Sequence, residues 1–362
     1  METAPPGAGA LDPSDPGCEA PLRAWLALQL SLALEPARAV AALREARGDP
    51  GGALRRARAP APPESALATA QVTLQRVGAR LLPLPAAAYP WRLALLREPP
   101  PLLAVRGDAG LLSQRAVAIV GARAATAYGL GVARRLAAEL AGVGVVVVSG
   151  LARGIDAAAH RGALEAGGAT VAVLACGPEQ VYPPEHRALA EQIAASGALV
   201  SELPPGTPPR APFFPLRNRL ISGLCEALVV VEARLRSGSL HTVRHALDQG
   251  IDVLAVPGPV DAPTSDGPNR LLRDGAAPAL DASDVLAALA GPARAPAPAN
   301  EPGRLAPELE ELLAALRREP TTRDALSRRL GLPPQVIAAR LLELELAGRV
   351  VEDRDGRLRA LS

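Results

Sequence analysis

The sequence predicts an α/β fold: a doubly wound, mostly parallel sheet flanked by a small N-terminal helical domain and a C-terminal winged helix. Two observations predict the sheet. Between residues 116 and 256, short runs rich in Val, Ile and Leu alternate with segments of helical periodicity, and these runs are apolar throughout. Continuous apolar strands indicate burial on both faces, and regular strand–helix alternation indicates right-handed crossovers between parallel strands.

Six buried strands are predicted, each by a short run of aliphatic residues. The runs occupy residues 116–120, 145–149, 170–174, 198–201, 227–231 and 252–256. Segments between them, such as Tyr128–Ala141 and Asp156–Ala166, carry apolar residues at helical spacing. We therefore expect a Rossmann-like domain over residues 79–290.

The residues before the sheet predict a small helical domain, SAM-like in character, over residues 20–78. Its boundaries follow from Pro and Gly, which interrupt helical periodicity. In order, the predicted segments are a disordered tail (1–19), two helices separated at Pro36 (20–46), a Pro/Gly/Arg linker (48–63), a third helix (65–76) and a Pro-punctuated arm (81–107).

The residues after the sheet predict a winged helix. A Pro/Ala-rich linker is expected at 291–304, and the winged helix at 305–362. The predicted segments are one helix at Pro307–Arg318, a second from Thr322 to Leu330, a third from Pro333 to Ala347, and a hairpin of residues 348–353 and 356–361.

Composition limits the classes of function. The 39 basic residues are all arginine and are nearly balanced by 37 acidic residues, so the net charge is +2. Any site for a polyanion must therefore be a local cluster of arginines. Aromatic residues make up 2% of the chain, too few for the base-stacking sheet of an RRM or OB fold.

The cysteines and the N-terminus indicate a cytoplasmic protein. Cys18, Cys176 and Cys225 are too few and too scattered for a disulfide framework or a zinc site. The first residues lack the basic and apolar regions of a signal peptide. The apolar stretch from Ala24 to Leu34 is too short to cross a bilayer. We expect no membrane association, no metal and no cofactor.

The first candidate site lies directly after the strand at 116–120, where Gly121 and Arg123 stand between that strand and the following helix. A glycine between a strand and a helix exposes backbone amides that bind phosphate. The dinucleotide fingerprint is absent, because Gly121 is followed by Ala122–Arg123, and the next strand ends in Ser149 instead of an acid. Arg123 is predicted to be an anion ligand.

The second cluster, residues 149–164, contains Gly150, Arg153 and Gly154. The glycines permit close backbone approach and Arg153 adds a cation. Asp156 can cap the following helix. His160, one turn later, is compatible with a general base or with capping and packing, and the lack of a nucleophile favours packing.

The third cluster is FFPLRNRLISGL, residues 213–224. Arg217, Asn218 and Arg219 stand where a Pro-rich loop enters a helix, a placement suited to gripping phosphates. Of the two phenylalanines, Phe213 and Phe214, one is expected to stack on an unpaired base and the other to anchor the core.

Two further clusters complete the crevice. Ser237–Gly238–Ser239 forms a small-residue nest at a helix start, and Pro257–Gly258 turns the last predicted strand. All five clusters follow carboxyl ends of strands, which line one crevice in an open parallel sheet. We expect Arg123, Arg217 and Arg219 to project into this open groove as a phosphate clamp. Asp156 and Glu232 are not arranged as a metal site, so we expect no enzyme.

Together, these segments of the sequence resemble a known family, DNA-processing protein A (DprA/Smf). The resemblance covers roughly residues 80–290, and the order and spacing of its segments make it specific. The N-terminal helices and the winged helix also lie where that family often carries them. The matching segments are VAIVGAR, SGLARGIDAAAHRGALEAGGATVAVLACG, VYPPEHRAL, SELPPGT, FPLRNRLISGL, VVVEARLRSGSLHT and VPGPVDAPTSDGPNRLLRDGA.

The resemblance implies a single-stranded DNA-binding protein with a modified Rossmann domain. Such a protein is expected to form a homodimer, to protect incoming DNA during natural transformation and recombination, and to load a RecA-type recombinase. The DNA contacts that it implies in this sequence are Gly121, Arg123, Gly150, Arg153, Gly154, Phe214, Arg217, Asn218, Arg219, Ser237, Gly238 and Ser239.

Two alternatives remain open. One is a nucleotide phosphoribohydrolase-like enzyme, which carries a Pro-Gly-Gly-x-Gly-Thr segment and a following catalytic glutamate; here the region reads SGSLHT without a nearby glutamate. The other is a nucleotide-sensing transcription regulator acting through the winged helix. Its third helix has only Arg340 against Glu343 and Glu345, which suits a major groove poorly.

Overall fold

The computed structural model describes residues 19–289, 307–318, 321–330, 337, 340–341, 344, 350–352 and 357–360. The chain divides into two compact units, Met1–Ala290 and Gly291–Ser362. The predicted disordered tail, apart from Glu19, and the predicted linker at 291–304 lie outside the described residues.

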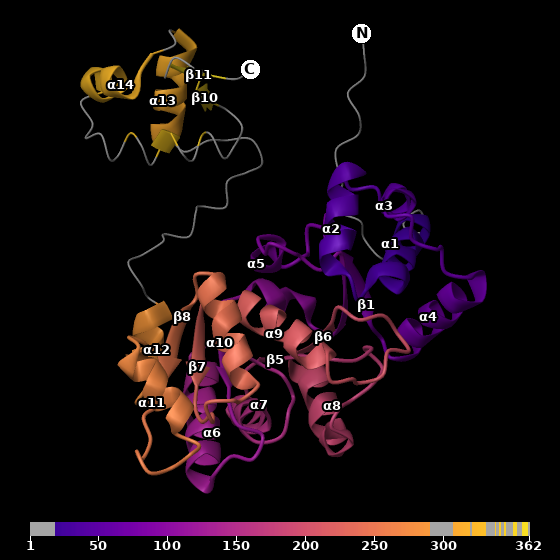
Figure 1. Ribbon diagram of the computed structural model, residues 1–362, viewed down its shortest axis with the longest axis vertical. Coiled ribbons are helices and arrows are strands. Elements are labelled where there is room, and N and C mark those ends of the chain that lie inside the picture. Colours follow the sequence, from indigo (N-terminus) through magenta and orange to yellow (C-terminus); the bar gives the residue numbers. More distant parts are fainter. Residues whose placement is uncertain are drawn as a thin grey trace. The chain divides into compact units, whose positions relative to one another are not determined.

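A nine-stranded sheet forms the centre of the first unit, in the order β1-β2-β6-β5-β4-β3-β7-β8-β9 (Figure 1). From β6 to β9 every neighbouring pair is parallel. All six predicted strands are confirmed, and their apolar runs are buried because helices cover both faces. These strands are β3 (Ala116–Val120), β4 (Val146–Ser149), β5 (Thr170–Val173), β6 (Ala198–Ser201), β7 (Ala227–Val230) and β8 (Asp252–Ala255).

The helices alternate with the strands and form two layers. Val117 and Ile119 of β3 face one layer, and Ala118 and Val120 face the other, as strand geometry requires. The first layer is α6 (Ala127–Gly142), α7 (Ile155–Glu165), α8 (Arg187–Ser196) and α12 (Ala282–Leu289). The second is α5 (Trp91–Ala94), α9 (Phe213–Gly223) and α10 (Ser239–Asp248); α11 (Asp266–Arg273) follows β8.

The order of the strands reverses beside β3. The chain builds β4, β5 and β6 outward on one side and then returns through α9 to place β7 on the other side of β3. The carboxyl ends of β3 and β7 therefore diverge into loops that lead to opposite layers. This is the position at which open α/β sheets bind their ligands.

The Pro-punctuated arm contains sheet structure that the sequence did not predict. It contributes β1 (Arg80–Pro83) and β2 (Leu102–Gly107), which pair antiparallel with each other, and β2 pairs antiparallel with β6. The short strand β9 (Ala277–Pro278) was also missed. The prolines around β2 conceal an apolar run, LLAV, that is fully buried at the edge of the parallel strands.

The predicted linker at 48–63 was partly wrong, because it contains a helix, α3 (Pro50–Arg56). Its composition, PGG, argues against a helix, but the start is unusually well capped. The Asp49 carboxylate accepts hydrogen bonds from the Gly51 and Gly52 amides at 3.0 and 2.8 Å, and proline at the first helical position loses no hydrogen bond.

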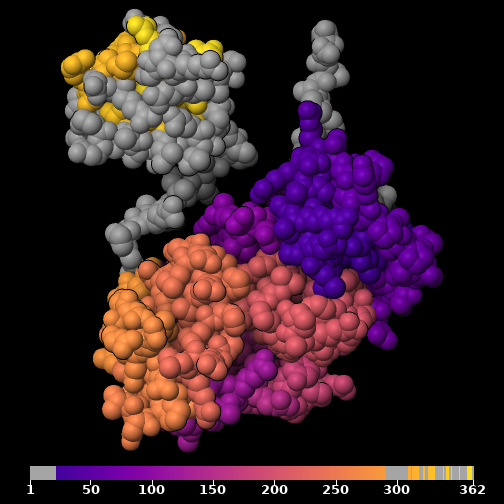
Figure 2. Space-filling view, viewed as in Figure 1, coloured from indigo at the N-terminus to yellow at the C-terminus, as the bar shows by residue number. Residues whose placement is uncertain are grey.

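The N-terminal helices share a core with the edge of the sheet. The helices are α1 (Glu19–Leu32), α2 (Pro36–Glu45), α3 and α4 (Glu64–Arg76), so the predicted break at Pro36 is confirmed. Trp25 and Leu28 pack in one apolar cluster with Leu102 and Ala104 of β2. The space-filling view shows the indigo helices lying directly against the α/β part of the same unit (Figure 2).

The second unit has two of the three helices and the hairpin that the sequence predicted for the winged helix. It contains α13 (Pro307–Arg318), α14 (Arg323–Leu330) and an antiparallel hairpin of β10 (Val350–Glu352) and β11 (Leu358–Ala360). Their core is built from Leu312, Leu316, Leu326, Ile337, Leu341, Leu344 and Leu358. Most of the predicted third helix lies outside the described residues. None of the described helices is both long and apolar enough to cross a membrane.

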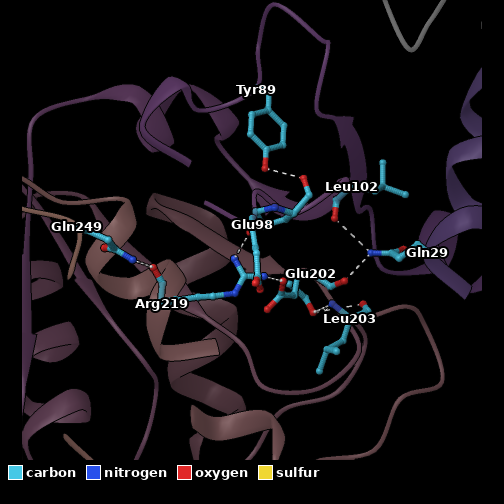
Figure 3. Close-up of polar contacts among 10 residues, drawn as sticks. Gln29, Tyr89, Glu98, Leu102, Glu202, Leu203, Arg219 and Gln249 are labelled. Atoms are coloured by element: carbon cyan, nitrogen blue, oxygen red, sulfur yellow. Dashed lines mark hydrogen bonds and ion pairs between the residues drawn. The ribbon is translucent and has the colours of Figure 1, made fainter. Parts of the chain in front are cut away.

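A buried polar network joins the N-terminal helices, the arm and the sheet (Figure 3). Arg219 of α9 forms an ion pair with Glu202, which follows β6, and donates to the Glu98 carbonyl at 2.9 Å. The amide of Gln29 on α1 donates to the carbonyls of Glu202 and Leu102 at 2.8 and 3.3 Å. Burial raises the pKa of Glu202 to about 7, although the Arg219 guanidinium opposes this shift.

We predict that Arg219→Ala strongly destabilises the protein. The variant leaves Glu202 buried without its partner, which costs on the order of 3 kcal/mol in urea unfolding. The loss of stability relative to the wild type should grow as pH rises above 7. Without Arg219 the folded-state pKa of Glu202 rises further above its unfolded value, and the stability gained from the protonated carboxyl disappears as pH rises through that pKa.

The matched control is Arg134→Ala. Arg134 also forms an ion pair, with Glu165, but the two side chains are 58% and 46% exposed. Exposed pairs contribute about 0–1 kcal/mol. Equal destabilisation by the two substitutions would contradict a structural role for the buried pair.

Candidate functional site

A cavity of about 780 Å³ opens where the order of the strands reverses. Residues 120–124, at the end of β3 and beyond it, form one side, and Arg234, Arg236, Ser237 and Gly238, which follow β7, form another. Further lining residues include Ala152 in the loop after β4, Asp156 in the first turn of α7, and Phe214, Arg217 and Asn218 of α9. The predicted crevice at the strand ends is therefore present as a defined cavity.

The cavity carries an excess of positive charge. Arg123, Arg217, Arg234 and Arg236 line it, whereas Asp156 is the one acidic residue among the lining residues that the structure describes. Arg123, Arg234 and Arg236 are exposed, and none of them forms an ion pair with a described residue. Charges gathered in a cleft between low-dielectric walls focus the field there.

Arg217 forms the floor of the cavity and is only 5% exposed. Its guanidinium donates to the Gly150 carbonyl at 2.8 Å and to the Val173 carbonyl, so α9 is tied to the ends of β4 and β5. Burial lowers the pKa of Arg217 to about 10, which still leaves a cation at neutral pH. Gly150 is required here, since a Cβ atom would lie 2.5 to 2.7 Å from the guanidinium.

Buried side chains fix the loop that follows β4. The Asp156 carboxylate accepts from the Gly150 and Ala152 amides at 3.1 and 3.3 Å. The Leu151 amide donates to Nε2 of His160 at 3.3 Å, and Nδ1 of His186 lies 2.9 Å from the Leu151 carbonyl. Leu151 has a left-handed φ of 56°, which these contacts stabilise.

His160 packs and does not act as a general base in this cavity. It is fully buried and is absent from the cavity lining. Burial lowers its pKa to about 3, so the ring is neutral, and its Nδ1 lies 2.7 Å from the Thr170 hydroxyl. Of the two roles left open for His160, the structure supports packing.

The two phenylalanines divide as the sequence suggested. Phe213 is buried in a small cluster with Ala175 and Leu203. Phe214 lines the cavity, where the Arg123 guanidinium lies 5.1 Å from its ring centroid. Tyr182 packs on the same ring at 5.5 Å and an interplanar angle of 60°. Phe214 and Tyr182 are thus the aromatic side chains among the described residues that line the cavity.

The segment at the start of α10 also belongs to the lining of the cavity. Ser237, Gly238 and Ser239 line it, and the two serine hydroxyls lie 2.7 Å apart. The Asn218 amide donates weakly to the Gly238 carbonyl at 3.4 Å. The positive end of the helix dipole makes a helix start a favourable place for an anion.

The structure gathers eight of the twelve predicted site residues in the cavity. They are Gly121, Arg123, Phe214, Arg217, Asn218, Ser237, Gly238 and Ser239. The other four do not line it. Gly150 lies beneath Arg217, Gly154 (φ 73°) packs against the Ala122–Arg123 backbone, Arg153 is paired with Glu185 at 2.5 Å, and Arg219 belongs to the buried network.

The structure corrects the expected position of two arginines and adds two arginines that were not predicted from the sequence. Arg217 and Arg219 do not project into an open groove: both are buried and hydrogen-bonded to carbonyl oxygens. Arg234 and Arg236 were not predicted, although both line the cavity. The sequence contained their signal, two arginines directly between a buried strand and the small-residue nest.

Similarity to known proteins shows the family of the chain. A family model described as DNA recombination-mediator protein A matches residues 80–290. The chain belongs to this family. A second model, the DprA winged helix domain, matches residues 292–356. The resemblance inferred from the sequence motifs is thereby confirmed.

The similarity to known relatives covers most of this chain. Protein Smf of Escherichia coli is 38% identical over 305 residues, 82% of each chain. DNA processing protein DprA of Bacillus subtilis is 42% identical over 210 residues, 58% of this chain and 71% of that one. The crystal structure of DNA processing protein A from Streptococcus pneumoniae is 31% identical with a TM-score of 0.65, and the match covers 73% of this chain and 97% of that chain.

We predict that Gly150→Ala destabilises this family member by about 1–3 kcal/mol in urea unfolding. The new methyl group displaces the Arg217 guanidinium and breaks hydrogen bonds to a buried cation. The control is Gly131→Ala in α6, where a Cβ meets nothing within 4 Å. Alanine in an open helix position is expected to stabilise by about 0.5–1 kcal/mol. Equal effects of the two substitutions would show that the Arg217 guanidinium does not depend on the missing side chain at Gly150.

Proposed function

We propose that the cavity holds single-stranded DNA by its phosphates, with little sequence preference. The observation that carries this proposal is the convergence of four arginines and the start of α10 on one cavity at the reversal of strand order. Three of those arginines have no acidic partner among the described residues. Phosphate groups of a strand would supply the missing counter-charges.

An aromatic ring in the lining of the cavity favours an unpaired strand over a duplex. Phe214 lies among the arginines, next to Tyr182, and a base can stack on it only when it has left the duplex. DNA processing protein A from Helicobacter pylori is described by its single-stranded DNA binding mode; it is 32% identical with a TM-score of 0.51, and the match covers 54% of this chain and 90% of that chain. This relative supports the same ligand here.

We propose further that the bound strand is not chemically altered. Asp156 accepts two backbone hydrogen bonds, and Glu232 accepts from the Thr126 amide and hydroxyl at 2.9 and 2.5 Å. His160 is buried and neutral. Each acid or base that the sequence offered for catalysis thus has a structural partner. This disfavours the phosphoribohydrolase-like alternative, and family membership disfavours the transcription regulator.

The cellular role that we propose follows from membership of the family. The protein would act in the cytoplasm as a homodimer, protect incoming single-stranded DNA during natural transformation, and load a RecA-type recombinase on it. The arrangement of arginines in a cleft suits this role, since phosphate contacts bind any sequence.

Arg123→Ala tests the phosphate contact. We expect the affinity for single-stranded DNA to fall about ten- to a hundredfold, because a hydrogen bond to a charged group contributes about 1.5–3 kcal/mol. The melting temperature should stay unchanged, since Arg123 is exposed. Arg123→Lys should recover only part of the affinity, because lysine keeps the charge and loses the planar fork.

The control for charge is Arg44→Ala on α2, an exposed arginine that does not line the cavity. Fluorescence anisotropy with labelled oligonucleotides measures all variants, with duplex of the same sequence as competitor. Equal affinities of Arg123→Ala and Arg44→Ala, or tighter binding of duplex than of single strand, would contradict the proposal.

The absence of turnover is tested separately. Single-stranded DNA and nucleoside monophosphates, incubated with the protein and divalent cations, should be recovered intact by gel and chromatographic analysis. Hydrolysis that co-purifies with the protein and disappears in Asp156→Asn or Glu232→Gln would refute this part of the proposal.

A further inference from the structure

A second cavity of about 500 Å³ lies next to the first. The two share one lining residue, Thr264, whose carbonyl accepts from the Ala233 amide at 2.8 Å. Thr264 is thereby held beside the end of β7, at the border between the cavities. The other lining residues come from the start of α6, from the segment after β7 and from the turn after β8: Thr126, Tyr128, Glu232, Pro257, Gly258, Pro259, Ala262 and Ser265.

The second cavity differs chemically from the first. None of its described lining residues is basic, and Glu232 is a buried acid. A phosphate would meet a carboxylate there without a compensating cation, and this is unfavourable. The walls are instead the rings of Tyr128, Pro257 and Pro259, so the cavity suits a flat, uncharged group.

The walls are held in place before any ligand binds. The Tyr128 hydroxyl donates to the Pro257 carbonyl at 3.0 Å, and this bond orients a ring that is 51% exposed. The Asn269 side chain grips the turn, since its amide donates to the Gly258 carbonyl at 2.9 Å and its oxygen accepts from the Gly258 amide at 3.2 Å. Fixed walls lower the entropic cost of binding.

We propose that this second cavity is a subsite for a nucleobase of the same strand whose phosphates occupy the first cavity. The proposal rests on the proposed function. It joins two facts: the cavities share the lining residue Thr264, and their chemistries match the two alternating parts of a nucleotide chain, phosphate and base. A base stacked on Tyr128 therefore belongs to a neighbouring nucleotide, not to the one stacked on Phe214.

The test is a length series of oligothymidylates from two to twelve nucleotides, competed against a labelled strand. Tyr128→Ala should bind the shortest oligonucleotides like the wild type and the longer ones about tenfold more weakly, because stacking of one base is lost. Tyr128→Phe keeps the ring and should recover that loss. Leu130→Ala is the matched surface control, because Leu130 is exposed on the same helix and lines neither cavity.

Arg123→Ala separates the two proposals in the same assay. It should weaken binding at every length. If it does so while Tyr128→Ala equals the wild type at all lengths, the base subsite is overturned and the proposed function stands. An equal loss in Tyr128→Ala at every length would also overturn a separate subsite. If Arg123→Ala has no effect at any length, the proposed function itself fails.

Discussion

The buried guanidinium of Arg217 is the interaction on which the site depends. Removing a cation from water is costly unless its donors are satisfied, and here carbonyls at the ends of β4 and β5 accept hydrogen bonds from Nη1 of this guanidinium. The helix that carries Arg217 and the loop at Gly150 must therefore fold together. Because the same helix presents Phe214 and Asn218, this constraint also sets the shape of the cavity.

The arginines of this protein have two separate physical roles. Arg217 and Arg219 are buried and hold backbone carbonyls, so they stabilise the frame. Arg123, Arg234 and Arg236 are exposed and unpaired within the described residues, so they supply the field of the cavity. A chain with a net charge of only +2 can thus present a strongly positive surface at one place.

Burial determines how much of this could be predicted from the sequence. The six strands from β3 to β8 are largely buried apolar runs, so they were predicted, whereas the exposed two-residue strand β9 was missed. Prolines concealed β2, and the sequence PGG concealed α3, which Asp49 caps. The site was found because glycines and arginines follow the strand ends. Arg217 and Arg219 are two residues apart on a helix, about 200° around its axis, so they cannot face one groove. The direction in which each points depends on Glu202 and Gly150, far away in the sequence.

The salt dependence of single-stranded DNA affinity tests the central claim most directly. If the cavity binds phosphates, the logarithm of the affinity falls linearly with the logarithm of salt concentration, and the slope decreases by about 0.7 for each phosphate contact removed. The account predicts a steep slope for the wild type, a slope smaller by about 0.7 in Arg123→Ala, and no change in Arg44→Ala. A slope near zero in the wild type, or the same slope in the wild type and Arg123→Ala, would contradict it.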